Sequence, residues 1–204
     1  MKNLGLGLLA SHGGTNVQAH IDAWEAGRTP ARPSIVISNN SQSLALERAR
    51  RHGVPTAHLS SATHPDPDAL DRAIRDALVA HGVRLVALCG YMKKLGPATL
   101  AHFGGRILNV HPGPLPRFGG QGMYGRHVHE AVVAAGVRET EVCIFVVEAE
   151  YDTGPVIARR AVAVAPSDTA DSLAERVLPV EHELYVDTVR RIATGELALP
   201  APAP

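Results

Sequence analysis

Short apolar runs alternate along the chain with segments in which apolar residues recur every three or four positions. Runs of the first kind are typical of buried strands, and segments of the second kind are typical of amphipathic helices. Strands are therefore predicted at residues 4–10, 33–38, 56–59, 85–89, 107–110, 141–147 and 156–164. Helices are predicted at residues 16–26, 44–52, 66–81, 125–135, 169–178 and 179–194, with a short one opening at Pro97.

Helix boundaries follow from capping residues and from proline. Asp66 or Asp68 is placed to cap the third helix, and Ser167 is placed to cap the helix that begins at Thr169. Proline suits the first turn of a helix but removes a hydrogen bond from an interior turn. Pro179 is therefore expected to separate two helices rather than to lie inside one.

The alternation of strands and helices predicts an α/β fold, namely a Rossmann-like, mostly parallel twisted sheet with helices on both faces. The strands at 141–147 and 156–164 are expected to pair antiparallel. No internal repeat or linker interrupts the pattern, so residues 1–197 are predicted to form one domain. Residues 198–204 form a Pro/Ala-rich tail that is expected to be frayed or extended.

Composition narrows the class of partner. The 204 residues include 20 Lys and Arg against 20 Asp and Glu, so the formal charge is zero. This balance gives no electrostatic reason to expect nucleic acid or an anionic membrane, and small molecules are the expected partners. No apolar stretch is long enough to span a membrane, and Cys89 and Cys143 lie within apolar runs, as expected for buried free thiols. The sequence therefore predicts a cytoplasmic protein, for which a homodimer is one option.

An amide, an imidazole and a carboxylate follow the ends of two predicted strands. Asn109 and His111 close the run that begins at Ile107, and Asp152 follows the run that ends at Val147. Since ligands of α/β sheets gather at the carboxyl ends of the strands, these three side chains are expected to meet there. An amide can hold an oxyanion, an imidazole can move a proton, and a carboxylate can hold the imidazole. The residues alone leave open the alternative of three unrelated polar loop residues.

The turn after the first strand has the features of an anion site. Gly13 and Gly14 let the backbone approach a ligand closely, and a helix N-terminus with free N–H groups follows. Thr15 and Asn16 add side-chain donors. The turn lacks both the GxGxxG pattern and the Walker lysine, which favours a monophosphate over a dinucleotide or a nucleoside triphosphate. The alternative is a tight turn in which glycine serves the geometry and Thr15 caps the helix.

A third candidate is the loop at 90–95, after the strand at 85–89. Met92 and Leu95 beside backbone donors could hold a flat heterocycle, while an ordinary strand–helix connection explains the loop equally well. Metal catalysis is disfavoured, because no ligand pattern such as HExxH accompanies the eleven histidines and the two cysteines form no CxxC pair.

Together these motifs resemble the phosphoribosylglycinamide formyltransferases, the folate-dependent enzymes of purine synthesis. The family's N-x-H-P-x-x-L-P motif appears at residues 109–116, and its D-x-G-P motif appears at residues 152–155. Its G-[ST]-N turn appears at residues 14–16, and the stretch Gly90-Tyr-Met-Lys-Lys-Leu95 also fits. The resemblance runs from Leu4 to Leu197, nearly the whole chain.

The resemblance implies a formyltransferase-type fold and a role for each candidate residue. Asn109, His111 and Asp152 would form the catalytic trio, and Glu181 would contact the ribonucleotide. The substrate phosphate would be held by the turn after the first strand, namely Gly14, Thr15 and Asn16. Two loops and part of the trio would bind the folate: Met92, Lys93, Lys94, Leu95, Asn109, Glu148, Ala149, Glu150, Tyr151 and Asp152.

The implied reaction moves a formyl group from the co-substrate 10-formyltetrahydrofolate to the amine of 5'-phosphoribosylglycinamide, a step of de novo purine (IMP) biosynthesis. Asn109 and protonated His111 would stabilise the oxyanion, and His111 would carry a proton to the leaving nitrogen. Asp152 would favour the charged form of His111 and fix its tautomer, so the pKa of His111 is expected to rise. Neither a metal nor a covalent intermediate is required.

Because of three departures from the family pattern, alternative functions remain to be considered. Gly113 stands where the family often has Ser, and Pro67 stands where some members place an Arg near the folate tail. The stretch 119–127 is longer than in the shorter members and could reshape the acceptor pocket. An alternative is therefore a different amine acceptor, such as an amino sugar or a specialised-pathway amine. Two further alternatives are hydrolysis of formyltetrahydrofolate and a non-catalytic nucleotide- or folate-binding module.

Overall fold

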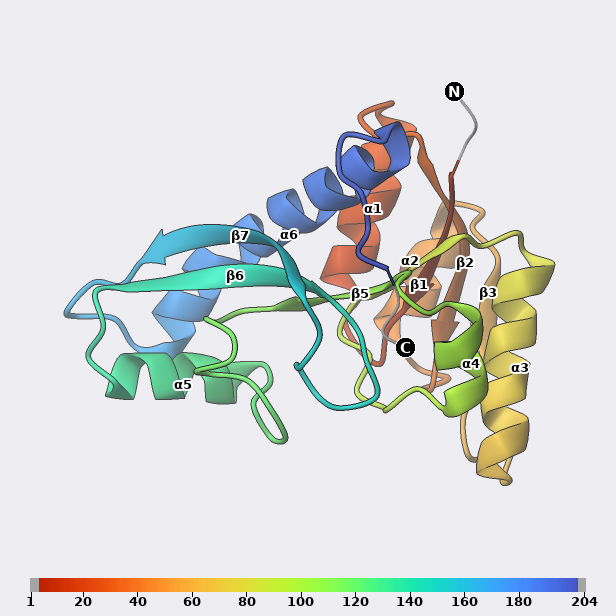
Figure 1. The fold of residues 1–204 in the computed structure, drawn as a ribbon, viewed down its shortest axis with the longest axis horizontal. Helices are drawn as coiled ribbons and strands as arrows, with labels where there is room; N and C mark the ends of the chain where they lie inside the picture. The colour runs from red at the N-terminus through yellow and green to blue at the C-terminus, as the bar shows by residue number, and fades with distance from the viewer. Residues whose placement is uncertain (1–3, 202–204) are drawn as a thin grey trace.

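The computed structural model describes residues 4–201, which form one seven-stranded sheet in the order β3-β2-β1-β4-β5-β6-β7 flanked by helices (Figure 1). The strands are β1 (Leu4–Leu9), β2 (Ala31–Ser38), β3 (Thr56–His58), β4 (Leu85–Leu88), β5 (Ile107–His111), β6 (Glu139–Val146) and β7 (Val156–Ala163). The helices are α1 (Thr15–Glu25), α2 (Leu44–Arg51), α3 (Pro67–Ala80), α4 (Pro97–His102), α5 (Arg126–Ala134) and α6 (Ala170–Thr194). The predicted α/β fold is confirmed. Residues 202–204 of the predicted tail lie outside the described residues.

The sheet changes direction at β5. Strands β3, β2, β1, β4 and β5 are mutually parallel, whereas β6 runs antiparallel to β5 and β7 runs antiparallel to β6. The antiparallel pairing expected for the last two strands is confirmed. Strand β5 therefore lies at the junction of a parallel half and an antiparallel half.

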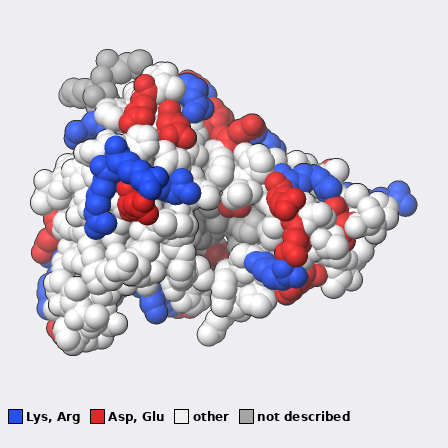
Figure 2. Space-filling view, turned by 180° about the vertical axis from the view of Figure 1, so that it is seen from behind, with Lys and Arg blue, Asp and Glu red and all other residues white. Residues whose placement is uncertain are grey.

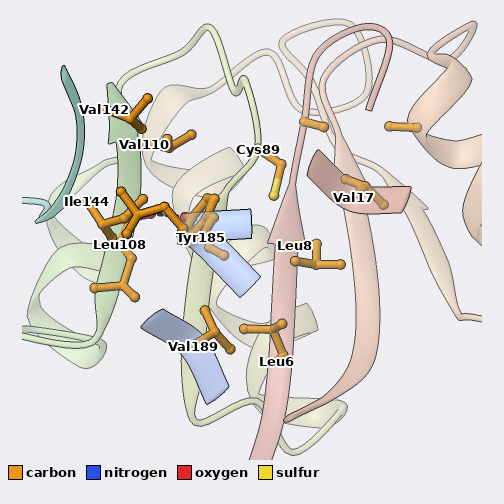
Figure 3. Close-up of a cluster of buried hydrophobic side chains, with 14 of the residues drawn as sticks. Leu6, Leu8, Val17, Cys89, Leu108, Val110, Val142, Ile144, Tyr185 and Val189 are labelled. Atoms are coloured by element: carbon orange, nitrogen blue, oxygen red, sulfur yellow. Dashed lines mark hydrogen bonds between the residues drawn. The ribbon is translucent and has the colours of Figure 1, made fainter. Parts of the chain in front are cut away.

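One face of the sheet packs against α1, α2, α5 and α6. Leu6 and Leu8 of β1, Leu108 of β5 and Ile144 of β6 point into this layer, and Tyr185 of α6 lies among them (Figure 3). The hydroxyl of the fully buried Tyr185 donates to the carbonyl of Leu108 at 2.9 Å. This layer holds the largest buried cluster, and it fixes α6 across the middle of the sheet.

The opposite face is covered unevenly. Helices α3 and α4 cover its parallel half, where Ile74 and Phe103 pack on strand residues such as Ile37 and Leu88. On β6 the same face carries Cys143 and Phe145, whose buried cluster is completed by Leu115 and other residues outside the helices. Loops rather than a helix therefore cover this part of the sheet, and both cysteines are buried free thiols as predicted.

The prediction of two helices around Pro179 is wrong. Helix α6 runs through Pro179, and it is capped by Thr169, whose side chain forms a capping box with Ser172, rather than by Ser167. An interior proline costs about 3 kcal/mol, whereas each fully buried aliphatic side chain contributes about 1.5–3 kcal/mol. Buried residues on both sides of Pro179, such as Val177 and Leu184, outweigh the missing hydrogen bond and keep the helix continuous.

The surface reflects the balanced composition. Lys and Arg side chains lie beside Asp and Glu on the face seen in Figure 2, which shows no broad region of one sign. Among residues 4–201, no helix combines the length and the apolar character that crossing a membrane would require.

Candidate functional site

A cleft of about 730 Å³ opens where β1, β4 and β5 end. Every residue that the sequence singled out for catalysis, phosphate binding or folate binding lines it: Gly14, Thr15, Asn16, Met92, Lys93, Lys94, Leu95, Asn109, His111, Glu148, Ala149, Glu150, Tyr151, Asp152 and Glu181. The structure therefore brings together side chains that are far apart in the sequence.

Strand β5 positions Asn109 and His111. The two residues are separated by one position, so they lie on the same face of the strand, while Leu108 and Val110 point into the core on the other face. The face of Asn109 and His111 is the one covered by loops. His111 is the last residue of β5, one position later than the predicted end of the strand, and its side chain is only 4% exposed.

Asp152 does not lie directly at the carboxyl end of a strand parallel to β5, as the sequence suggested. Because β6 is antiparallel to β5, the end of β6 pairs with the start of β5, and Val146 lies opposite Leu108. The segment 147–155 then brings Asp152 back to His111. Asp152 adopts a left-handed φ of 55°, uncommon outside glycine, and its Oδ2 accepts a 2.9 Å hydrogen bond from the Gly120 N–H. The carboxylate is therefore held by backbone from another loop.

The tautomer of His111 is fixed by a carbonyl rather than by Asp152. His111 Nε2 donates to the Phe118 carbonyl at 2.7 Å, whereas Nδ1 lies 3.9 Å from Asp152 Oδ2, beyond hydrogen-bond reach. Nε2 must carry a hydrogen in both the neutral and the charged ring, so Nδ1 is the nitrogen that gains and loses the proton. Asp152 acts on that proton through its charge.

The expected rise of the His111 pKa is wrong. Burial lowers the pKa of His111, and this effect outweighs the upward effects of the Asp152 charge and of the hydrogen bond to the Phe118 carbonyl. The sequence showed the neighbouring carboxylate but not the depth at which the ring is buried. The protonated ring is therefore a stronger acid than an exposed imidazolium, and it gives up its proton more readily.

The turn between β1 and α1 has unblocked backbone donors. Gly14 occupies the N-cap position with a φ of 68°, and α1 has no side-chain cap hydrogen bond. The alternative of a plain tight turn is wrong in one part, since Thr15 is the first helical residue and does not cap the helix, whereas the left-handed φ of Gly14 shows that glycine does serve the geometry. A helix N-terminus that faces a cleft with free N–H groups is suited to an anion.

Glu181 and Asn16 form a buried polar pair at the same end of the cleft. Burial raises the pKa of Glu181 to about 7, and a hydrogen bond from the Asn16 side chain opposes this rise. The Oδ1 atom of Asn16 has no hydrogen-bond partner among the described residues. Buried polar atoms without a partner are costly, and a ligand in the cleft could supply one here.

The chain matches a known protein family. The family model described as "Formyl transferase" matches residues 6–189. The chain belongs to the formyl transferase family.

Two relatives of this formyl transferase share the name phosphoribosylglycinamide formyltransferase. It is 37% identical over 188 residues to the chloroplastic phosphoribosylglycinamide formyltransferase of Arabidopsis thaliana, an alignment that covers 92% of the chain and 64% of that relative. It is 33% identical over 192 residues to the phosphoribosylglycinamide formyltransferase of Escherichia coli (strain K12), covering 94% of the chain and 88% of the relative. The chain thus spans less than two thirds of the length of the Arabidopsis protein and nearly all of the Escherichia coli one.

The fold comparison gives the same family. The crystal structure of glycinamide ribonucleotide transformylase 1 from Symbiobacterium toebii superposes with a TM-score of 0.89 at 38% identity, covering 98% of this chain and 92% of that one. A formyltetrahydrofolate deformylase from Pseudomonas syringae superposes with a TM-score of 0.84 at 20% identity, which shows a shared fold.

In this formyl transferase, Gly113 does not enlarge the cleft. A Cβ atom at Gly113 would lie 2.7 Å from Cγ1 of Val128, so the side chain of α5 already fills the space that a serine would need. Gly113 is also not among the residues that line the cleft, and neither is Pro67, the first residue of α3.

The loops at 92–95 and 148–151, which hold most of the folate candidates, also line the cleft. Lys94 lies 3.4 Å from the Glu150 carboxylate and 5.5 Å from the centre of the Tyr151 ring, so the two candidate loops contact each other. Met92 and Tyr151 are exposed, while Leu95 is buried. The backbone N–H of Met92 donates to the Ser11 hydroxyl, which links the first of these loops to the segment that leads into the turn before α1.

The sequence reasoning did not name several residues of the cleft wall. Met123 and Tyr124 belong to the long 119–127 stretch, which was marked only as a loop that could reshape the pocket. His129 of α5 also lines the cleft, and its buried Nδ1 has no hydrogen-bond partner among the described residues. Burial lowers the pKa of His129, and the charge of His111 lowers it further. Its only sequence signal was its position in the first turn of a predicted amphipathic helix, close to the loop.

A potential metal-binding group lies elsewhere. Within residues 4–201, one cluster of three side chains could offer ligands to an ion, formed by Asp22, Glu25 and His52. The cluster joins α1 to the end of α2 outside the cleft, and the side-chain amide of Gln18 already contacts both Asp22 and His52.

Proposed function

We propose that this chain transfers the formyl group of 10-formyltetrahydrofolate to the amine of phosphoribosylglycinamide in de novo purine biosynthesis, with residues 1–197 acting as one catalytic domain. The observation that carries the proposal is one continuous cleft. It joins a helix N-terminus with free backbone donors to an Asn–His pair on β5. A phosphorylated amine can therefore lie with its phosphate on the turn and its amine beside His111.

The mechanism uses two donors and one movable proton. The substrate amine attacks the formyl carbon, and the carbonyl oxygen takes the negative charge, which the Asn109 amide and protonated His111 stabilise through hydrogen bonds. The carbon–N10 bond then breaks, and N10 takes a proton that His111 supplies from Nδ1 directly or through water. The proton lost by the attacking amine restores His111.

The position of each group supports its role. The Phe118 carbonyl holds Nε2, so the proton moves only on Nδ1, and the Asp152 charge at 3.9 Å favours its return. The low pKa caused by burial makes protonated His111 an effective acid toward N10. The wall formed by 92–95 and 148–151 is the proposed folate site, and Glu181 with the anion-binding turn is the proposed ribonucleotide site.

The test is a turnover assay with purified protein and 10-formyltetrahydrofolate. Formylated product should appear with phosphoribosylglycinamide, should fall sharply with an unphosphorylated amino sugar, and should be lost in His111→Ala. His81→Ala, which alters an exposed histidine at the end of α3, is the matched control. Hydrolysis at the same rate without any amine, or tight binding of both ligands without turnover, would overturn the proposal.

A further inference from the structure

Helix α2 packs directly behind the anion-binding turn and donates hydrogen bonds to two of its successive carbonyls. The His12 carbonyl accepts from the Ser43 hydroxyl at 2.8 Å and from the Ala45 N–H at 3.1 Å. The Gly13 carbonyl accepts from Arg48 Nε at 2.9 Å. The packing is tight, since a Cβ atom at Gly14 would lie 2.6 Å from the Cα of Ala45.

These contacts determine where the amides of the turn point. In a trans peptide, the carbonyl of one residue and the N–H of the next point in opposite directions. Since α2 holds the carbonyls of His12 and Gly13, the N–H groups of Gly13 and Gly14 point away from α2. His12 to Asn16 line the cleft and no residue of α2 does, so the contacts of α2 direct these amides toward the cleft.

Arg48 lacks the acidic partner that Arg51 has on the same helix. Arg51 pairs with Glu47, whereas no carboxylate of residues 4–201 lies within ion-pair distance of Arg48. The half-buried Arg48 guanidinium bonds only neutral acceptors, namely the Gly13 carbonyl and, at 3.4 Å, the Gln18 side chain. Its charge therefore remains uncompensated beside the turn.

We propose that Arg48 is a positioning residue for the substrate phosphate. It orients the Gly14 amide by holding the Gly13 carbonyl, and its positive charge stabilises the phosphate from behind the turn. This inference rests on the proposed function for the identity of the phosphorylated substrate, but the behaviour of the anion site can be measured without turnover. Charge-assisted hydrogen bonds are among the stronger ones, so loss of Arg48 should weaken phosphate binding about tenfold.

The experiment measures binding of ribose 5-phosphate by isothermal titration calorimetry to the wild type, Arg48→Ala, Arg48→Lys and Arg51→Ala. Arg48→Ala should weaken binding about tenfold, Arg48→Lys should restore part of the loss, and Arg51→Ala should stay within about twofold of the wild type. Circular dichroism and thermal unfolding establish that each variant is folded. Equal affinity in the wild type and folded Arg48→Ala would overturn the inference.

Steady-state kinetics separate positioning from general damage. In Arg48→Ala the KM for phosphoribosylglycinamide should rise about tenfold, while kcat and the KM for 10-formyltetrahydrofolate change by less than about twofold. If kcat and both KM values worsened to a similar extent, the inference would be contradicted, because this would show a structural role only. If ribose 5-phosphate binds in an Arg48-dependent way but phosphoribosylglycinamide is not formylated, the proposed function fails and the inference stands.

Discussion

The two ends of the cleft are built in opposite ways. At the proposed phosphate end, the turn at 12–14 lies between the parallel strand β1 and helix α2, and hydrogen bonds from α2 fix its carbonyls. At the proposed catalytic end, Asp152 lies on a loop of the antiparallel half, and its described hydrogen bond comes from another loop residue, Gly120. The parallel half thus supplies fixed backbone donors, whereas the antiparallel half supplies a carboxylate that is held by a loop.

The largest effect is expected from removal of His111, the proposed proton carrier. His111→Ala should reduce kcat about a thousandfold, since general acid–base catalysis typically contributes 10²- to 10⁴-fold. Steady-state assays at saturating substrates measure the loss, and ribose 5-phosphate should still bind because the turn is untouched. A loss of less than about tenfold, with His81→Ala as the control, would exclude His111 as the proton carrier.

The next prediction tests the rigidity of the turn at 12–14, whose carbonyls are held by α2. Gly14→Ala would place a side chain at a φ of 68° and only 2.6 Å from the Cα of Ala45, so either the turn or α2 must move. We expect a loss of about 2 kcal/mol in the free energy of unfolding and weaker binding of ribose 5-phosphate. Urea unfolding measures the change in the free energy of unfolding. Gly13→Ala is the matched control, because its Cβ would meet no atom within 4 Å, and equal stability of the two variants would contradict the tight packing.

A smaller effect is expected where the two loops of the catalytic end meet. A Cβ atom at Gly119 would lie 2.3 Å from Leu115 and 3.2 Å from the Cβ of Asp152. Gly119→Ala should therefore displace Asp152 and reduce kcat about tenfold, since small misplacements at a reacting centre are costly. The KM for phosphoribosylglycinamide should stay nearly constant. A rise in that KM with unchanged kcat would show that the loop serves the acceptor instead.

The last two predictions concern protonation, first of His111 in the cleft and then of His20 on α1. In the free protein the pKa of His111 should lie below its usual value of 6.5, and Asp152→Asn should lower it further by removing the charge that opposes burial. Nitrogen-detected NMR titration of the imidazole measures both values and should show Nε2 protonated in the neutral ring. A higher pKa in Asp152→Asn would mean that Asp152 does not stabilise the charged ring.

Burial, and to a lesser extent the charge of His182, lowers the pKa of His20 on α1 to about 3. The folded state therefore binds this proton less well than the unfolded state, so its contribution is complete above pH 6.5 and is lost as the pH falls toward 3. His20→Leu should reduce the loss of unfolding free energy between pH 7 and pH 5 by about 2 kcal/mol. Urea unfolding at the two pH values tests this, and an unchanged pH dependence would mean that His20 titrates alike in the folded and unfolded states.

The sequence predicted most of the fold because local patterns and tertiary packing agree. The helical periodicity of residues 66–81 and the cap at Asp66 predicted α3 almost to the residue. Pro179 was misjudged because its local cost is visible in the sequence, whereas the burial of its neighbours against the sheet is not. Residues 202–204 of the predicted tail are not described.

The sequence also indicated which side chains would meet, but not how they are held. Asn109 and His111 could be placed on one face from their spacing alone. The hydrogen bond between His111 and the Phe118 carbonyl has no sequence signal, since every residue has a carbonyl. The direction of β6 and the burial of His111 are likewise long-range properties. For that reason the expected route of Asp152 to the site and the expected rise of the His111 pKa were both wrong.

The alternation of side chains along β5 has a consequence for how such a protein can change over evolutionary time. Asn109 and His111 share a face only because a single residue separates them, so inserting or deleting one residue there would turn one of them into the core. Within the stretch 119–127, the loop residues 121–124 have no such constraint on their number, since doubling a loop costs only about 0.6 kcal/mol in closure entropy. New acceptor specificities are therefore expected to arise from insertions in this stretch, while the one-residue spacer on β5 stays unchanged.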